Sequence, residues 1–154
     1  MVLSGLDALD TIFERYPLRH YKKGQVFVLS GENSDYVYSL VEGRVKMYDV
    51  AYNGDEIILN VYKSPAYFPV SHAIGKTVNK YIYEAESDTT VRRSPIGDVR
   101  TLLRTNSTVM FALLGQLYQR IDHLLDREVM LMSGSAKSRL LYELVTQSRQ
   151  FGTK

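Results

Sequence analysis

Glycines spaced along the first third of the chain separate short segments in which apolar and polar residues alternate. These glycines are Gly24, Gly31, Gly43 and Gly54. Alternation with a period of two is the pattern of a strand with one buried face. Glycine suits the tight turns between such strands because it adopts a positive φ without steric cost. Several short strands at regular spacing predict an antiparallel roll and not a βαβ sheet.

The composition limits the classes of function that this chain can serve. Its 154 residues are 45% hydrophobic, enough for one compact domain with an appendage. The net charge of +2 gives no strongly basic surface for nucleic acid or membrane. The absence of cysteine excludes disulfides, thiol catalysis, zinc–thiolate sites and cysteine-ligated iron–sulfur clusters. Residues 1–10 lack a basic region and a long apolar run, so we expect no signal peptide, no spanning helix and a cytoplasmic protein.

Helices are expected on both sides of the strand-rich part of the chain. Residues 4–16 carry apolar side chains at helical spacing, which predicts a short amphipathic helix. Strands are expected through 18–62 and again from 81 to 91. The segment 63–80 contains two prolines and interrupts the alternation, and 98–103 is expected to form a helical turn.

The segment after the strands has the pattern of one long helix with an interaction seam. From Asn106, a suitable N-cap, to Met132 it contains no proline. The seam positions are Met110, Leu114, Leu117, Ile121, Leu124, Glu128 and Leu131. Their alternating spacings of 4 and 3 are those of a coiled coil, so we expect a homodimer through this helix. The alternative is a single amphipathic helix that lies on its own core.

Two further features bear on the seam. A flanking apolar stripe of Phe111, Tyr118 and Leu125 favours two burial partners for the helix, its own roll and a second copy. Glu128 is the charged exception within the seam. Its carboxylate would need to pair with Arg127 or with a cation of the partner chain, or else lie where the two helices splay apart.

A second helix is expected after a break at Ser133 and Gly134. Ser135 is a suitable N-cap, and Leu140, Leu141, Leu144 and Val145 share one face of the helix that follows.

The order of three motifs resembles the sensor domain of the Crp/Fnr transcription regulators. The motifs are Lys23-Gly24, then Gly31-Glu32, then Tyr38 through Val45. The resemblance implies a mainly β fold with α-helices: an antiparallel β-roll or jelly roll of the cyclic-nucleotide-binding type. It also implies a short N-terminal helix, a long C-terminal dimerisation helix and one further helix.

The resemblance divides the chain into three parts. Residues 1–104 would be the β-roll sensor domain, 105–132 the dimerisation helix, and 133–154 a hinge with the first helix of a winged helix-turn-helix domain. Ser133-Gly134 would be the hinge. Since no recognition helix follows, the chain is expected to be truncated, and DNA would be bound only by a full-length parent. A free-standing sensor domain is the alternative.

In relatives that bind cyclic nucleotides, a Gly-Glu pair and an Arg-Ser or Arg-Thr pair hold the ribose and the phosphate. Here the first pair falls on Phe68-Pro69 or Pro69-Val70, and the second falls on Asn79-Lys80. The polar pair that contacts the base falls on Leu124-Leu125. Losing two hydrogen bonds to charged groups would weaken binding by about 10²–10⁴-fold. Lys80 or Lys76 could replace part of the charge, so weak cyclic-nucleotide binding stays an alternative.

The resemblance also defines a candidate ligand pocket. Its residues are Phe68, Pro69, Val70, Ser71, His72, Asn79, Lys80, Tyr81, Tyr83, Leu124 and Leu125. One interpretation is that the aromatic rings fill the space that a nucleotide occupies elsewhere. The other is a pocket for a small aromatic or lipidic effector, oriented by tyrosine hydroxyls.

We expect neither a metal, a cofactor nor a catalytic residue. His72 lies one residue from the haem-ligating histidine of carbon-monoxide-sensing relatives, and one residue turns a helical side chain by about 100°. The three histidines have no metal-ligand spacing, and no nucleophile elbow, P-loop or H-E-x-x-H motif is present. The carboxylates of 55–56 and 84–86 are expected to be exposed, as are Arg92-Arg93 and the Arg100/Arg104 pair.

The sequence therefore predicts the effector-sensing and dimerisation part of a bacterial Crp/Fnr-type regulator that does not respond to cyclic nucleotide. The alternative is a ligand-free dimerisation scaffold whose pocket is filled by side chains.

Overall fold

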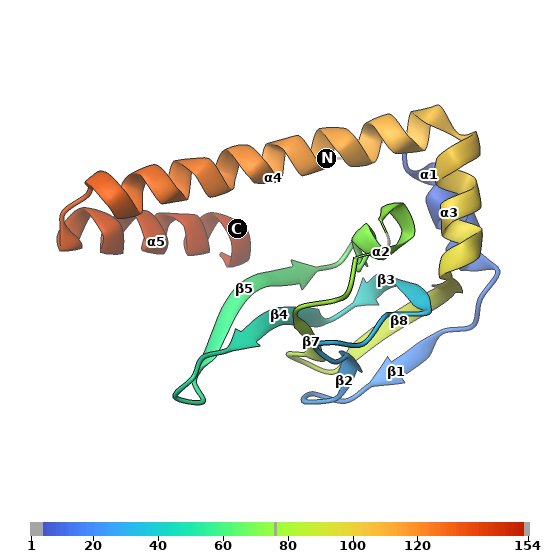
Figure 1. The fold of residues 1–154 in the computed structure, drawn as a ribbon, viewed down its shortest axis with the longest axis horizontal. Helices are drawn as coiled ribbons and strands as arrows, with labels where there is room; N and C mark the ends of the chain where they lie inside the picture. Colours follow the sequence, from blue (N-terminus) through green and yellow to red (C-terminus); the bar gives the residue numbers. More distant parts are fainter. Residues whose placement is uncertain (1–4, 76, 153–154) are drawn as a thin grey trace. The chain divides into compact units, whose positions relative to one another are not determined.

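Two antiparallel four-stranded sheets form the first part of the molecule (Figure 1). The computed structural model describes residues 5–75 and 77–152. The chain divides into two compact units, Met1–Phe111 and Ala112–Lys154. In the first sheet the order is β1 (Arg19–Tyr21), β8 (Thr89–Pro95), β3 (Tyr36–Glu42) and β6 (Ala66–Phe68). In the second it is β2 (Val26–Val28), β7 (Ile82–Ala85), β4 (Arg44–Val50) and β5 (Glu56–Lys63). The predicted antiparallel roll is confirmed.

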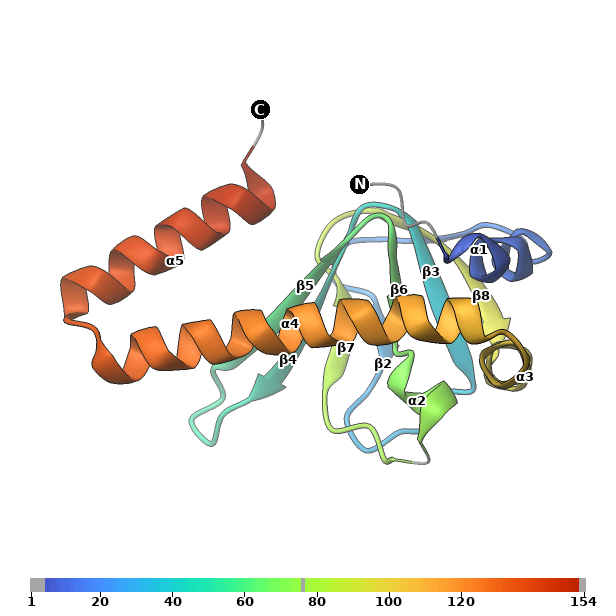
Figure 2. The same cartoon turned by 90° about the horizontal axis from the view of Figure 1, so that it is seen from above.

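The first sheet is covered on its outer face by helices. α1 (Asp7–Glu14) packs on β8, and α3 (Ile96–Thr105) packs on β8 and β3 (Figure 2). Apolar side chains at helical spacing are buried there, namely Leu6, Leu9, Phe13, Val99 and Leu103. Tyr67 of β6 stacks on Phe13 with ring centroids 5.5 Å apart, and its hydroxyl donates to Asp10.

The helices differ in length from those expected from the pattern. The first begins at Asp7 and ends at Glu14 inside the predicted 4–16, and residue 4 lies outside the described residues. The predicted turn at 98–103 is a ten-residue helix, Ile96–Thr105. Within the interrupted segment 63–80, the chain forms β6 and the four-residue helix α2 (Ser71–Ile74).

The long helix α4 extends over Ser107–Ser133, and α5 over Ala136–Phe151. Asn106 begins α4 as predicted, because its Oδ1 accepts a hydrogen bond from the Val109 amide at 3.1 Å. Ser135 begins α5 in the same way, accepting from the Ser138 amide at 3.2 Å. Both predicted N-caps are confirmed.

Gly43, between β3 and β4, offers a test of how tightly the roll is built. It has a φ of 90°, and a Cβ there would lie 2.5 Å from the carbonyl oxygen of Asp88. Gly54 has the same φ of 90° but nothing within 4 Å of such a Cβ. A left-handed conformation costs an alanine about 1–2 kcal/mol at either position. Crowding against backbone adds about 1–3 kcal/mol at position 43 alone.

We therefore expect Gly43→Ala to lower the free energy of unfolding by more than Gly54→Ala does. Urea denaturation followed by circular dichroism measures both variants. Equal losses would contradict the close approach of the β3–β4 turn to β8.

Candidate functional site

Five aromatic rings fill the space between the two sheets, and we call them the roll cluster. Phe68 of β6 is fully buried at its centre. Its ring centroid lies 5.3 Å from those of Phe27 and Tyr38, 5.4 Å from that of Tyr62 and 5.7 Å from that of Tyr83. The rings come from β2, β3, β5, β6 and β7, so the cluster joins both sheets. Phe68, Tyr38 and Tyr83 are buried, Phe27 and Tyr62 are half-buried against them, and large buried rings contribute strongly to a core.

Two tyrosines of the roll cluster, Tyr38 and Tyr83, stay protonated at neutral pH. Burial raises the pKa of Tyr38 to about 12. Burial, reinforced by the neighbouring Tyr62, also raises the pKa of Tyr83. Tyr81 is half-buried and packs against the same core. The structure thus brings three predicted pocket residues, Phe68, Tyr81 and Tyr83, to the interior of the roll.

Asn79 and Lys80 have different environments, although they are neighbours in sequence. The buried Asn79 side chain donates to the carbonyl oxygens of Leu29 at 2.8 Å and Tyr81 at 2.5 Å. Its own oxygen accepts from the Tyr81 amide at 3.3 Å. Lys80 is exposed, and its carbonyl accepts from the Ser30 hydroxyl at 2.8 Å. The amide of Asn79 therefore holds two loops together. Lys76 lies outside the described residues.

The remaining predicted residues of this region surround α2. Pro69 is buried, Val70 is half-buried, and Ser71 is exposed at the start of the helix. His72 is buried on the helix itself. Phe68 faces the roll cluster, whereas His72 lines a separate cleft of about 240 Å³. The lining residues of that cleft are Asn33, Ser34, His72, Gly75, Thr77, Ile96 and Arg100.

Arg100 of α3 holds α2 in place. Its Nε donates to the carbonyl oxygen of Ala73 at 3.1 Å, and its Nη2 donates to that of His72 at 3.3 Å. The expectation of an exposed Arg100/Arg104 pair is wrong for Arg100, which is half-buried, and right for Arg104. The expectation of exposure is also wrong for Arg92 and Arg93, which are both half-buried: Arg92 donates to the carbonyl oxygen of Tyr16, and Arg93 lies over the ring of Tyr36.

His72 is a buried histidine with an unpaired nitrogen. The residue is 7% exposed, and within the described part of the chain its Nδ1 has no hydrogen-bond partner. Burial lowers the pKa of His72 below its ordinary value. The ring is therefore neutral at pH 7.

This lowered pKa makes the stability of the first unit depend on pH. Because the unfolded chain binds the proton more readily, stability should fall as the pH drops from about 6.5 toward the folded-state pKa of His72. Below that pKa both states are protonated and the effect levels off. We expect His72→Gln to reduce the slope, by at most about 1.4 kcal/mol per pH unit. Urea midpoints of both proteins between about pH 5 and 8 measure this, and identical slopes would contradict the burial of the ring.

The predicted seam lies along α4 as an apolar surface. Leu117 is 49% exposed, Leu124 60% and Leu131 47%, whereas Met110 is half-buried. The other seam positions, Leu114, Ile121 and Glu128, are exposed as well. The flanking stripe of Phe111, Tyr118 and Leu125 is also exposed.

Among the ion pairs of the described residues, none joins Glu128, the charged residue of the seam, to Arg127. Arg127 instead donates from Nε to Glu143 of α5 at 2.7 Å. α4 ends at Ser133 and α5 begins at Ala136, so the break between them lies at Gly134 and Ser135, and of the two predicted hinge residues Ser133 still belongs to α4. A hinge motion at Ser133 and Gly134 stays a prediction.

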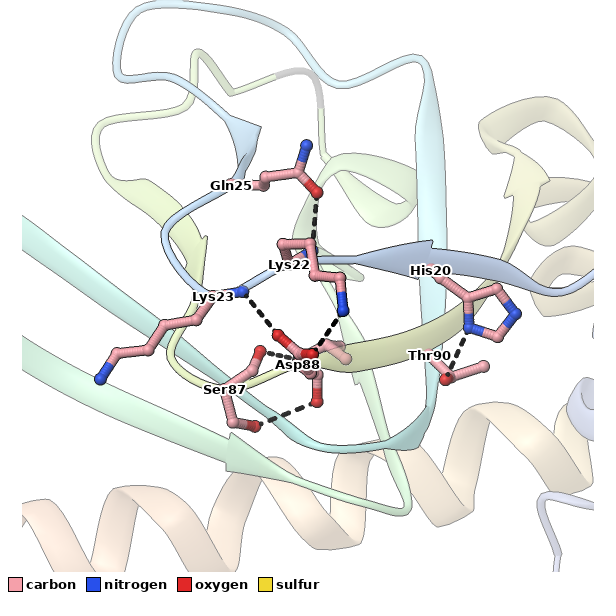
Figure 3. A network of polar contacts seen from close by, with 8 residues as sticks. His20, Lys22, Lys23, Gln25, Ser87, Asp88 and Thr90 are labelled. Atoms are coloured by element: carbon pink, nitrogen blue, oxygen red, sulfur yellow. Dashed lines mark hydrogen bonds and ion pairs between the residues drawn. The ribbon is translucent and has the colours of Figure 1, made fainter.

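A polar network joins Lys22 and Lys23, the two residues after β1, to Asp88. Lys22 Nζ lies 2.7 Å from Asp88, whose carboxylate also accepts from the Lys23 amide at 3.1 Å (Figure 3). Lys22 and Lys23 lower the pKa of Asp88 by these hydrogen bonds. His20 and Thr90 form a further contact of 3.1 Å beside it. The network ties the β1–β2 turn to the β7–β8 turn and is structural.

Glu84 and Glu86 are half-buried, which corrects the expectation that they are exposed. Glu84 accepts from the Tyr48 hydroxyl at 2.9 Å and lies 3.3 Å from Lys46 Nζ. Glu86 pairs with Arg44 at 3.0 Å. These pairs brace the outer face of the second sheet.

Among residues 5–75 and 77–152, no group of three or more histidine, aspartate or glutamate side chains could hold a metal ion. No helix in the described part of the chain is long and apolar enough to cross a membrane.

Comparisons with known proteins agree with this architecture. Residues 18–106 match the family model of the cyclic nucleotide-binding domain. The HTH-type transcriptional regulator ArcR of Staphylococcus aureus (strain Newman) is 29% identical over 125 residues, which are 80% of this chain and 53% of that protein. The chain thus spans about half the length of the curated relatives it matches.

Solved structures show the same fold. The sensor domain of the transcriptional regulator DNR from Pseudomonas aeruginosa aligns with a TM-score of 0.64 at 24% identity, covering 80% of this chain and 85% of that one. The catabolite activator protein of Thermus thermophilus aligns with a TM-score of 0.67 at 20% identity, covering 82% and 59%.

Proposed function

Because the chain belongs to the cyclic nucleotide-binding domain family and is related to the sensor part of Crp/Fnr regulators, we propose that it senses an effector and forms a homodimer within such a regulator. The parent protein would act in the bacterial cytoplasm and bind DNA. DNA binding by the parent protein is supported by the name of the S. aureus relative, which is an HTH-type transcriptional regulator. The three parts predicted above, 1–104, 105–132 and 133–154, would be the sensor, the dimerisation helix and the hinge with the first helix of the DNA-binding domain.

Dimerisation is supported by the surface of α4. Its seam presents exposed leucines and isoleucine in the 4–3 spacing of a coiled coil, and fully burying each gains about 1.5–3 kcal/mol. A second copy of the same helix is the partner that this spacing fits.

The effector is proposed not to be a cyclic nucleotide. The observation that carries this is the roll cluster, because Phe68 and its four neighbouring rings occupy the interior of the roll. The position expected for a cationic phosphate clamp holds Asn79, whose amide is engaged by backbone groups. Pro69 lacks the N–H group that a phosphate oxygen would need.

A ligand-free dimerisation scaffold is the second candidate function, and the same observation favours it. A roll already packed with aromatic rings needs no ligand to complete its core. The activity of the regulator would then be controlled by the amount of protein in the cell and not by an effector.

Native mass spectrometry of freshly purified protein tests both candidates. A dimer with a reproducible extra mass would support the sensor. A dimer without extra mass, at twice the 17.6 kDa of one chain, would favour the scaffold. Monomer alone would overturn both. Calorimetric titration with cyclic AMP and cyclic GMP then tests the ligand class. Saturable binding at micromolar concentration would overturn the proposal that the chain does not respond to cyclic nucleotide.

A further inference from the structure

The cleft beside α2 is separate from the roll cluster, because none of the five rings is among its described lining residues. It is bounded by the β2–β3 loop, by α2 with the residues after it, and by α3. Its volume of about 240 Å³ is below the range of about 300–1,000 Å³ for pockets of drug-sized ligands, so it suits a smaller molecule, and Ile96 gives it one apolar wall. All of these residues belong to the first compact unit.

The charge of the cleft favours an anionic group. The described residues that line it include one charged side chain, Arg100, and no carboxylate. Arg100 uses two of its five N–H groups on the carbonyl oxygens of His72 and Ala73, which fix the orientation of the guanidinium. The other N–H groups can bind a ligand, and the planar fork matches the two oxygens of a carboxylate.

His72 gives a second, independent indication of a ligand. The residue is more than nine-tenths buried at the wall of the cleft, and its Nδ1 has no partner among the described residues. Buried polar atoms are almost always hydrogen-bonded, and an exception calls for a functional reason or a bound group. A neutral ring also keeps one N–H group that can donate to a bound oxygen.

We propose that this cleft binds a small organic carboxylate, held at its charged end by Arg100 beside His72 and at its apolar end by Ile96. Since Arg100 also holds the carbonyl groups of α2, a ligand that engages its guanidinium would act on the helix that directly follows β6. Binding of the carboxylate does not depend on the proposed function; only the interpretation of this ligand as the effector rests on it.

The test is a titration of the full chain with benzoate, followed by the NMR signals of Arg100 Nε–H and the His72 ring. We expect saturable shifts of both signals. Arg100→Gln should weaken benzoate binding by about tenfold or more, because hydrogen bonds to a charged group are lost. The control is Arg104→Gln, which removes the same charge from an exposed position of the same helix. It should change the affinity by less than about twofold.

Arg100→Gln removes the bonds to α2 and can unfold the chain, so a second variant is needed. Asn33→Asp places a repelling carboxylate in the cleft at an exposed loop position, and it should weaken benzoate binding without touching α2. No saturable shift at about 10 mM benzoate would overturn the proposal, since a ligand of this size should bind in the millimolar range or better. Equal losses in the Arg100 and Arg104 variants would do the same.

Inorganic phosphate binding as tightly as benzoate would overturn the carboxylate class. Binding is measured on the chain itself, so a monomer in native mass spectrometry would refute the proposed function and leave this titration unaffected.

Discussion

Phe68→Ala is expected to lower the free energy of unfolding by about 3–5 kcal/mol, the range for removing a buried phenylalanine ring from a packed core. Phe68 is fully buried, and its ring contacts those of Phe27, Tyr38, Tyr62 and Tyr83. These rings come from strands of both sheets, so they cannot close over the space without moving the sheets. The loss therefore includes a cavity as well as the transfer of the ring to water.

The control for this variant is Tyr52→Ala. Tyr52 is an aromatic residue on the β4–β5 turn, and its side chain is fully exposed. Its removal should change stability by no more than about 0.5 kcal/mol. Urea denaturation of both variants gives the comparison. A loss of stability in Phe68→Ala close to that of the control would show that the roll is not packed around this ring.

The same variant separates the two interpretations of the roll interior. An apolar cavity left by a removed ring stays dry and can bind a small aromatic molecule such as benzene. If the rings fill the interior, benzene should raise the melting temperature of Phe68→Ala and leave that of the original protein unchanged. An equal rise in both would show that the roll already contains an effector-sized pocket.

The strands were predictable because their signals are local. Period-two alternation and glycine at tight turns can be read from neighbouring residues, and Gly24, Gly31, Gly43 and Gly54 all have positive φ. The two N-caps, Asn106 and Ser135, are local for the same reason, since each accepts from an amide three residues on.

The contacts that shape the candidate site are not local. Arg100 and Arg104 are four residues apart, a helical spacing that predicts two charges exposed to solvent. The guanidinium of Arg100 instead donates to carbonyl oxygens 27 and 28 residues earlier in the chain. Phe68 could be placed near the pocket from sequence, yet its position in the core follows from the pairing of β6 with β3. Backbone acceptors and strand pairing leave no periodic pattern, so a single sequence cannot indicate them.

The double variant Leu117→Asp with Ile121→Asp is expected to weaken dimerisation by about 10⁴-fold or more. Each dimer would lose four apolar side chains from the seam, at about 1.5–3 kcal/mol for each one fully buried. Four carboxylates would also face one another across the interface, and burying charge without a partner is unfavourable. Sedimentation velocity at micromolar concentration should show a dimer for the original chain and a monomer for this variant.

The matched control is Gln119→Asp with His123→Asp on the same helix. It adds two carboxylates at the same spacing of four residues, but at exposed positions on the opposite face of α4. The two variants therefore have equal numbers of new carboxylates and differ in the face that carries them. If the control alone stays dimeric, the seam carries the contact. If both variants stay dimeric, the chain associates through another surface and the seam assignment is wrong. If both become monomeric, charge repulsion along the helix is the cause, and the apolar seam loses its support.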